Sequence, residues 1–110
     1  MELKQEKTDK CSIVSISGRL DTTTYSILEK MLNELIDGQQ DKILLECSEM
    51  DYVSSSGLRV FLMALKKITQ IKGRFIICGL QENIREIFEI SGFTKVFEIY
   101  NTAGEAIVQF

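Results

Sequence analysis

Short apolar runs alternate along the sequence with longer segments in which apolar residues recur every three or four positions. The runs at 43–45 and 75–78 are typical of strands buried on both faces. The longer segments carry charged residues on the opposite side, as amphipathic helices do. The pattern predicts strands over 2–7, 12–17, 42–47, 74–78 and 96–100. It predicts helices from 27 to Gly38, from the serines at 54–56 to Gly73, over 81–90 and from Thr102 onward.

Each predicted helix has an apolar stripe that is expected to face the core. Gly73 is expected to end the second helix as a left-handed cap, and Gly92 to stop the third. Thr102 and Glu105 form a capping-box pattern that opens the last helix. The predicted inward positions are Ile27, Leu28, Met31, Leu32, Leu35 and Ile36 in the first helix, Leu58, Phe61, Leu62, Leu65, Ile68 and Ile71 in the second, Ile84, Ile87 and Phe88 in the third, and Ala106, Ile107 and Phe110 in the last.

The predicted order of elements is ββαβαβαβα. Strands that alternate with helices favour a mostly parallel sheet with right-handed crossovers and helices covering it. At 110 residues the chain fits a single α/β domain over 1–110 with one core. Functional residues in such folds tend to lie beyond the carboxyl ends of strands. The segments at 18–24 and 51–59 are expected at such positions.

Composition narrows the classes of partner. The chain is 45% hydrophobic and 26% charged, with a net charge of −3 and a pI near 5.0. An acidic surface argues against wide contact with nucleic acid, because neutralising phosphates requires a basic one, and it favours a protein partner. No apolar stretch reaches the roughly 18 residues of a membrane span, and residues 1–7 are too charged to lead a secretory signal. We expect a cytoplasmic protein without membrane insertion.

Chemistry that depends on cysteine pairs or on imidazole is not expected. The three cysteines, at 11, 47 and 78, are far apart and lie in or beside apolar segments, so they are interpreted as small buried hydrophobes. The chain has no histidine, which excludes Ser-His-Asp and Cys-His nucleophiles and metal sites that need histidine. No glycine-rich phosphate loop of the P-loop type is present. We therefore expect no enzymatic activity, no metal and no cofactor.

The segment Ser54-Ser55-Ser56-Gly57 is the main candidate for function, because it lies where a strand turns into a helix. The first turn of a helix has unpaired backbone N–H groups and a partial positive charge. A serine there can cap the helix, and it can also carry a phosphate in a favourable field. The residues alone leave both roles open.

Three neighbouring residues have two interpretations each. Gly57 allows either close packing of the loop backbone or access for a kinase beside the acceptor. Arg59 is either a solvated helix charge or a contact to a partner or phosphate. Asp21 is either a helix cap or an interface residue. Leu58 is expected in the core.

Two segments, Gly18-Arg19-Leu20-Asp21-Thr22 and 51–59, together resemble the STAS domain family, specifically the bacterial anti-sigma factor antagonists. The resemblance covers nearly the whole chain. It implies a partner-switching protein whose unphosphorylated form binds an anti-sigma factor that is itself a serine kinase, and so releases a sigma factor. Phosphorylation ends the binding, and a serine phosphatase is expected to reverse it.

The resemblance also implies residue roles. The phosphoacceptor falls on Ser56, with Ser55 as the alternative. Many members have Asp where this chain has Ser54, so no carboxylate is expected to tune the acceptor from that position. The implied partner-binding residues are Asp21, Thr22, Ser54, Ser55, Ser56, Gly57 and Arg59.

A second function is compatible with the same family. STAS-like domains also occur as cytoplasmic subunits of lipid ABC transport complexes, and co-purification with an ABC ATPase would favour that role. The intact serine triplet favours the anti-sigma factor antagonist.

Overall fold

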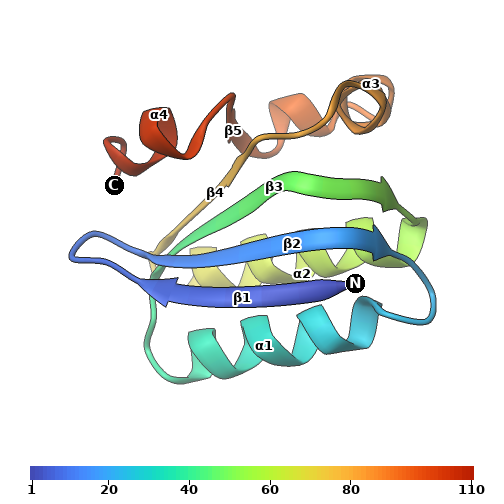
Figure 1. Cartoon of the computed structure of the whole chain (residues 1–110). Coiled ribbons are helices and arrows are strands. Elements are labelled where there is room, and N and C mark those ends of the chain that lie inside the picture. The colour runs from blue at the N-terminus through green and yellow to red at the C-terminus, as the bar shows by residue number, and fades with distance from the viewer.

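A five-stranded sheet forms the centre of the computed structural model, which describes all residues, 1–110 (Figure 1). The predicted order of elements is confirmed, with one short 3-10 turn added. The elements are β1 (Glu2–Lys7), β2 (Ser12–Leu20), α1 (Tyr25–Asp37), β3 (Lys42–Val53), α2 (Ser55–Gln70), β4 (Arg74–Cys78), α3 (Glu82–Ile90), the turn η1 (Phe93–Lys95), β5 (Glu98–Tyr100) and α4 (Ala103–Ile107).

The strands lie in the order β1-β2-β3-β4-β5, so neighbours in the sequence are neighbours in the sheet. β1 and β2 form an antiparallel hairpin, whereas β2, β3, β4 and β5 pair in parallel, which confirms the mostly parallel sheet. Because parallel strands point the same way, the segments that follow β2 and β3 lie at one edge of the sheet (Figure 1). Both candidate segments lie at this carboxyl edge.

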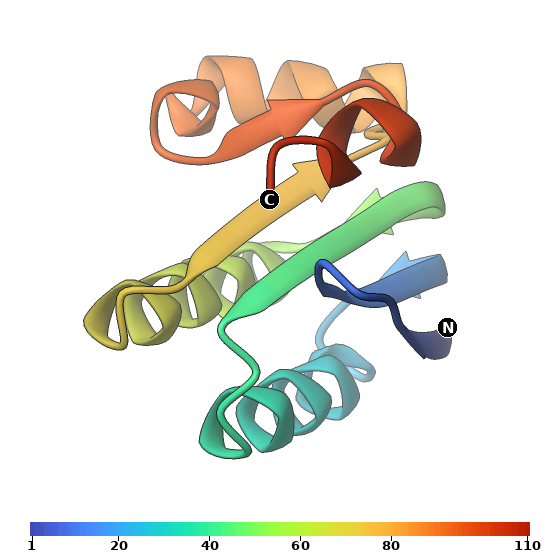
Figure 2. The same ribbon diagram turned by 90° about the vertical axis from the view of Figure 1, so that its left-hand side faces the viewer.

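The two faces of the sheet are covered unequally. α1 and α2 lie side by side on one side of the sheet, and α4 lies on the other (Figures 1 and 2). The main core contains 22 buried residues from α1, α2, α3 and the strand positions facing them. A smaller cluster joins α4 to β3 and β4, and its buried members are Cys11, Leu44, Ile76, Cys78 and Ala106. The helices therefore cover one face fully and the other only toward β4 and β5.

Two strands are longer than predicted. β2 continues to Leu20 and β3 to Val53, whereas the apolar runs predicted ends at 17 and 47. The extension of β3 is mostly polar because only every third side chain there is buried; register shifts in the β2–β3 pairing interrupt the strict alternation of a strand. Met50 and Val53 are buried, while the residues around them are exposed. β5 is shorter than predicted, and Val96 lies outside it and is exposed.

The predicted helix stripes are correct at their centres and wrong at their margins. The apolar side chains of Ile27, Leu62, Ile71 and Ile87 are exposed. In α2 the buried line instead consists of Gly57, Val60, Phe61, Ala64 and Ile68. The line begins with a glycine because α2 approaches the sheet closely at its first turn.

Gly73 is not the left-handed cap that the sequence predicts. Lys72 has the positive φ, 60°, and Gly73 is required for space, since a Cβ there would lie 2.2 Å from the carbonyl oxygen of Asp41. Gly92 does have a left-handed conformation, with φ of 76°, and the Thr102 hydroxyl accepts from the backbone N–H of Glu105 as the capping pattern predicts.

All three cysteines are buried and free, as expected. Burial raises the pKa of the Cys78 thiol to about 12 and that of Cys47 well above its ordinary value. Both thiols therefore remain protonated and act as small apolar groups. None of the helices combines the length and the apolar character that a membrane span needs.

An ion pair between Arg74 of β4 and Glu98 of β5 joins β5 to the neighbouring strand. The Arg74 guanidinium donates to both carboxylate oxygens of Glu98, at 2.9 and 2.5 Å, and to the backbone carbonyl of Gln109. The Tyr100 hydroxyl donates to Glu98 Oε2 at 2.6 Å. The hydrogen bond from Arg74, supported by that from Tyr100, lowers the pKa of the Glu98 carboxyl.

This pair predicts an acid-dependent loss of stability. A carboxyl with a lowered pKa in the folded state stabilises the fold above its unfolded pKa of about 4.5, and the contribution disappears as the pH falls through the lower folded value. Urea denaturation at pH 7 and pH 3 should show a larger loss for wild type than for Glu98→Gln, by up to about 1 kcal/mol because the pair is partly exposed. Glu89→Gln, which changes an exposed carboxylate without an ion pair, should behave like wild type. Equal losses for Glu98→Gln and wild type would contradict the assignment.

Candidate functional site

The two candidate segments meet at the carboxyl edge because β2 and β3 pair to their ends. Leu20 is level with Val53 in the parallel register. Beyond that rung, the backbone N–H of Ser54 donates to the carbonyl of Leu20 at 2.8 Å. The turn between β2 and α1 is thus fastened directly to the first turn of α2.

Ser54 is the cap of α2. It has an extended backbone, and its Oγ accepts from the backbone N–H of Gly57 at 3.3 Å. Ser and Asp are both strong N-cap residues, so Ser54 preserves the cap at the position where the resemblance noted in the sequence would more often have Asp. The capping role that the sequence left open therefore belongs to Ser54 and not to Ser55 or Ser56.

Ser55 and Ser56 lie in the first turn of α2, just inside the cap. Ser55 is exposed and Ser56 is half-buried. Neither hydroxyl hydrogen-bonds to another protein group, and no buried polar side-chain atom in the structure lacks a partner. Both hydroxyls are therefore reached by solvent and lie near the backbone N–H groups of a helix start.

Gly57 is buried beneath these serines and packs against both strands. A Cβ there would lie 2.8 Å from Leu20 Cγ and 2.9 Å from Val53 Cγ2. These distances are too short for a side chain, so the packing interpretation explains this glycine without an appeal to kinase access. Gly57 contributes to the site by holding the first turn of α2 against the sheet.

Asp21 organises the turn between β2 and α1. Its Oδ1 accepts from the backbone N–H and the hydroxyl of Thr23, at 3.0 and 2.7 Å. The Thr24 hydroxyl accepts from the Asp21 N–H and donates to the carbonyl of Arg19, both at 2.9 Å. The two hydrogen bonds from Thr23, that of its hydroxyl first, lower the pKa of the Asp21 carboxyl. Asp21 is a loop-forming residue and not the helix cap, which is Thr24.

The remaining candidates lie on the surface around this turn. Thr22 is exposed in the turn, and Arg59 is exposed on α2 without an ion pair. Leu58 is half-buried and packs against the main core.

Sequence reasoning missed one pair at this edge. The Arg19 guanidinium carbon lies 4.0 Å from the centroid of the Tyr52 ring, and Arg19 Nε lies 3.5 Å from Asp21 Oδ2. Arg19 and Tyr52 are level in the β2–β3 register, on the strand extensions that the apolar pattern did not predict. The only sequence signal was an Arg and a Tyr inside the two motifs, and their pairing depends on the register.

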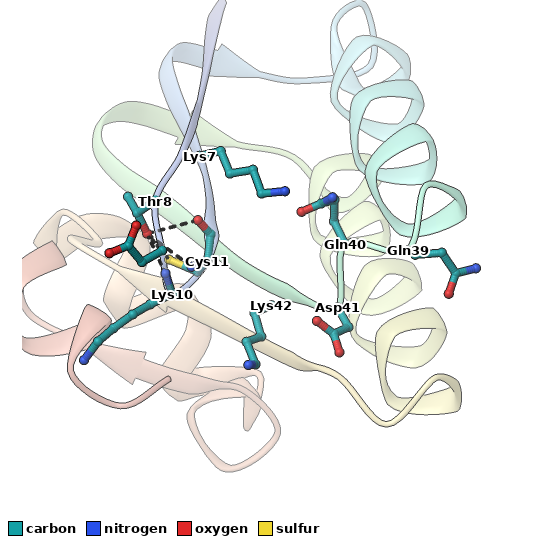
Figure 3. A pocket seen from close by; sticks show the side chains of 9 residues that line it. Lys7, Thr8, Lys10, Cys11, Gln39, Gln40, Asp41 and Lys42 are labelled. Atoms are coloured by element: carbon teal, nitrogen blue, oxygen red, sulfur yellow. Dashed lines mark hydrogen bonds between the residues drawn. The ribbon is translucent and has the colours of Figure 1, made fainter.

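Two shallow hollows lie away from the serines. One, of about 260 Å³, is at the opposite edge of the sheet and has three lysines among its lining residues (Figure 3). Lys7, Lys10 and Lys42 point in different directions there, so they do not converge on a common ligand. The other, of about 300 Å³, lies on the uncovered face over β1, β2 and β3. No group of His, Cys, Asp or Glu residues is arranged to hold a metal ion.

Comparison with known proteins identifies the family. Residues 2–106 match the STAS domain. The chain belongs to the STAS domain family. Within that family it resembles the anti-sigma factor antagonists, as the two motifs indicated.

The curated relatives cover the full domain. BtrV of Bordetella bronchiseptica, named as a candidate anti-sigma factor antagonist, is 34% identical over 100% of this chain and 95% of its own length. The anti-sigma-B factor antagonist of Listeria monocytogenes is 30% identical over 96% of this chain and 91% of its own length.

Solved structures agree on the fold. A crystal structure of an anti-sigma factor antagonist from Mycobacterium paratuberculosis superposes with a TM-score of 0.90 at 23% identity, over 98% of this chain and 92% of the other. The unphosphorylated form of SpoIIAA superposes with a TM-score of 0.77 at 15% identity, over 98% of this chain and 96% of the other. The phosphorylated form superposes with a TM-score of 0.78 at 20% identity, over 98% of both chains. At these identities the likeness shows that the STAS fold is shared.

The packing role of Gly57 predicts a stability defect. In Gly57→Ala the new methyl must displace Leu20 or Val53, so the free energy of unfolding should fall by about 1–3 kcal/mol in urea denaturation. Gly104→Ala is the matched control, because the nearest atom to its Cβ would be 3.9 Å away. It should leave stability unchanged or slightly increased. A Gly57→Ala protein as stable as this control would restore kinase access as the explanation.

Proposed function

We propose that this STAS domain is an anti-sigma factor antagonist that is switched by phosphorylation of Ser56. In the unphosphorylated state it binds an anti-sigma factor that is a serine kinase, and this binding releases a sigma factor. The domain is then a substrate of the kinase and a binding module, not an enzyme. The observation that carries the proposal is the unbonded, half-buried hydroxyl of Ser56, in the first turn of α2 beside the Asp21 turn.

The fold itself should tolerate a phosphate at this position. Backbone N–H groups and the helix dipole at the start of α2 favour an anion. The cap does not depend on the modified residue, because Ser54 accepts from Gly57 with its own hydroxyl. SpoIIAA, a protein of the same fold, has been solved in both phosphorylation states. These observations support a switch that leaves the domain folded.

The partner need not tolerate the same phosphate. A phosphoserine adds about −1.5 to −2 charges and three strong acceptor oxygens. Asp21 and Asp51 already place carboxylates at this edge of an acidic chain. Burying the phosphate in an interface would bring desolvation and like-charge repulsion, and about 1.4 kcal/mol of either weakens binding tenfold. Phosphorylation would thus end binding with little refolding.

The partner-binding surface in this proposal is the carboxyl edge. Its exposed or half-buried members are Asp21, Thr22, Ser54, Ser55, Ser56 and Arg59, with Gly57 acting from beneath as a packing residue. A serine phosphatase that restores the free hydroxyl completes the cycle. The named relatives favour this role over that of a subunit of a lipid transport complex.

The acceptor assignment predicts a single modified residue. Incubation with the cognate anti-sigma factor kinase, ATP and Mg²⁺, followed by mass spectrometry, should show one phosphate on Ser56. Ser56→Ala should abolish the modification, and Ser55→Ala should retain it. Ser55→Ala is the matched control, because it also removes an unbonded hydroxyl from the first turn of α2. Modification that persists in Ser56→Ala and disappears in Ser55→Ala would move the site to Ser55.

A further inference from the structure

We propose that Arg19, which lies over the ring of Tyr52, is a charged anchor that binds a carboxylate side chain of the anti-sigma factor. This inference rests on the proposed function and extends it to a residue outside the serine segment. Arg19 and Tyr52 occupy the rung of the β2–β3 pair just before Leu20 and Val53, at the carboxyl edge.

Two contacts orient the guanidinium of Arg19. It stacks on Tyr52 at 4.0 Å from the ring centroid, and its Nε faces Asp21 Oδ2 at 3.5 Å. A side chain that is ordered before binding loses less conformational entropy when it binds. The Asp21 carboxylate is itself held by two hydrogen bonds from Thr23. Asp21 therefore helps to orient the planar, fork-shaped guanidinium of Arg19.

The free side of the fork faces solvent. The side chain of Arg19 is 61% exposed, and its two terminal nitrogens donate to no protein group. Tyr52 is 39% exposed, which leaves a large aromatic ring at the surface next to a cation. Arg and Tyr are among the residues that contribute most to binding when they lie within an interface. A planar fork with two free donors matches a carboxylate, which it can bind through two parallel hydrogen bonds.

The pair is continuous with the proposed interface. Leu20, the residue after Arg19, accepts the hydrogen bond from the backbone N–H of Ser54. The Thr24 hydroxyl also joins the carbonyl of Arg19 to the Asp21 turn. Leu20 and Val53 point into the core beneath α2, so Arg19 and Tyr52, one residue earlier on each strand, point to the other face of the sheet. A protein that covers the serines and extends around this edge would reach the Arg19–Tyr52 pair.

The test is the affinity of the unphosphorylated domain for its cognate anti-sigma factor, measured by isothermal titration calorimetry at two salt concentrations. Arg19→Ala should weaken binding about tenfold or more and reduce its salt dependence. Arg19→Lys should recover only part of the affinity, because an ammonium keeps the charge but not the planar fork. Tyr52→Phe should bind like wild type, whereas Tyr52→Ala should weaken binding because the stack is lost.

Lys7→Ala is the matched control, because it removes one exposed positive charge at the opposite edge of the sheet. It should bind like wild type, and thermal denaturation of each variant checks that the fold is intact. Wild-type affinity in Arg19→Ala would overturn the anchor, and it is also the result expected if Arg19 contacts only the phosphate of Ser56. That result would leave the proposed function intact, provided that the wild-type domain binds and loses binding on phosphorylation. A wild-type domain that does not bind would overturn both.

Discussion

The parallel pairing of β2 and β3 to their last residues is the constraint on which the functional edge depends. The rung between Leu20 and Val53, followed by the bond from the Ser54 N–H to the Leu20 carbonyl, joins two segments that are more than thirty residues apart in the sequence. Gly57 completes the junction, because its missing Cβ lets the first turn of α2 lie against both strand ends. If this junction shifted, the Asp21 turn, the serines and the Arg19–Tyr52 pair would no longer share a surface.

At this junction, the residues that stabilise the helix start differ from the residues whose hydroxyls are free for modification. Ser54 and Gly57 hold the helix start through a cap and a close contact, while the hydroxyls of Ser55 and Ser56 make no internal bond. A charge added to an unbonded hydroxyl can alter what docks on the surface without removing an interaction that the fold needs. This division of roles within four consecutive residues is a physical basis for a switch that works by changing an interface.

The apolar pattern predicted the order of elements because buried strands and amphipathic helices have different periods. The prediction failed where a strand is mostly exposed, because its residues are then polar although the backbone is extended. The extensions of β2 to Leu20 and of β3 to Val53 carry polar residues toward the uncovered face, so they looked like loops. Ile27, Leu62 and Ile87 have helical spacing but lie at the margins of their stripes, and only packing determines which margin is buried.

By itself, the sequence determined the α/β class, the element order, the buried cysteines and the candidate serines, because these follow from local periodicity and from two short motifs. Only the tertiary structure decided which serine caps α2, why Gly57 and Gly73 must be glycines, and that Arg19 stacks on Tyr52. Those properties depend on the register of β2 with β3 and on the separation between α2 and the sheet. Both are set by contacts between residues distant in the chain, which no local pattern contains.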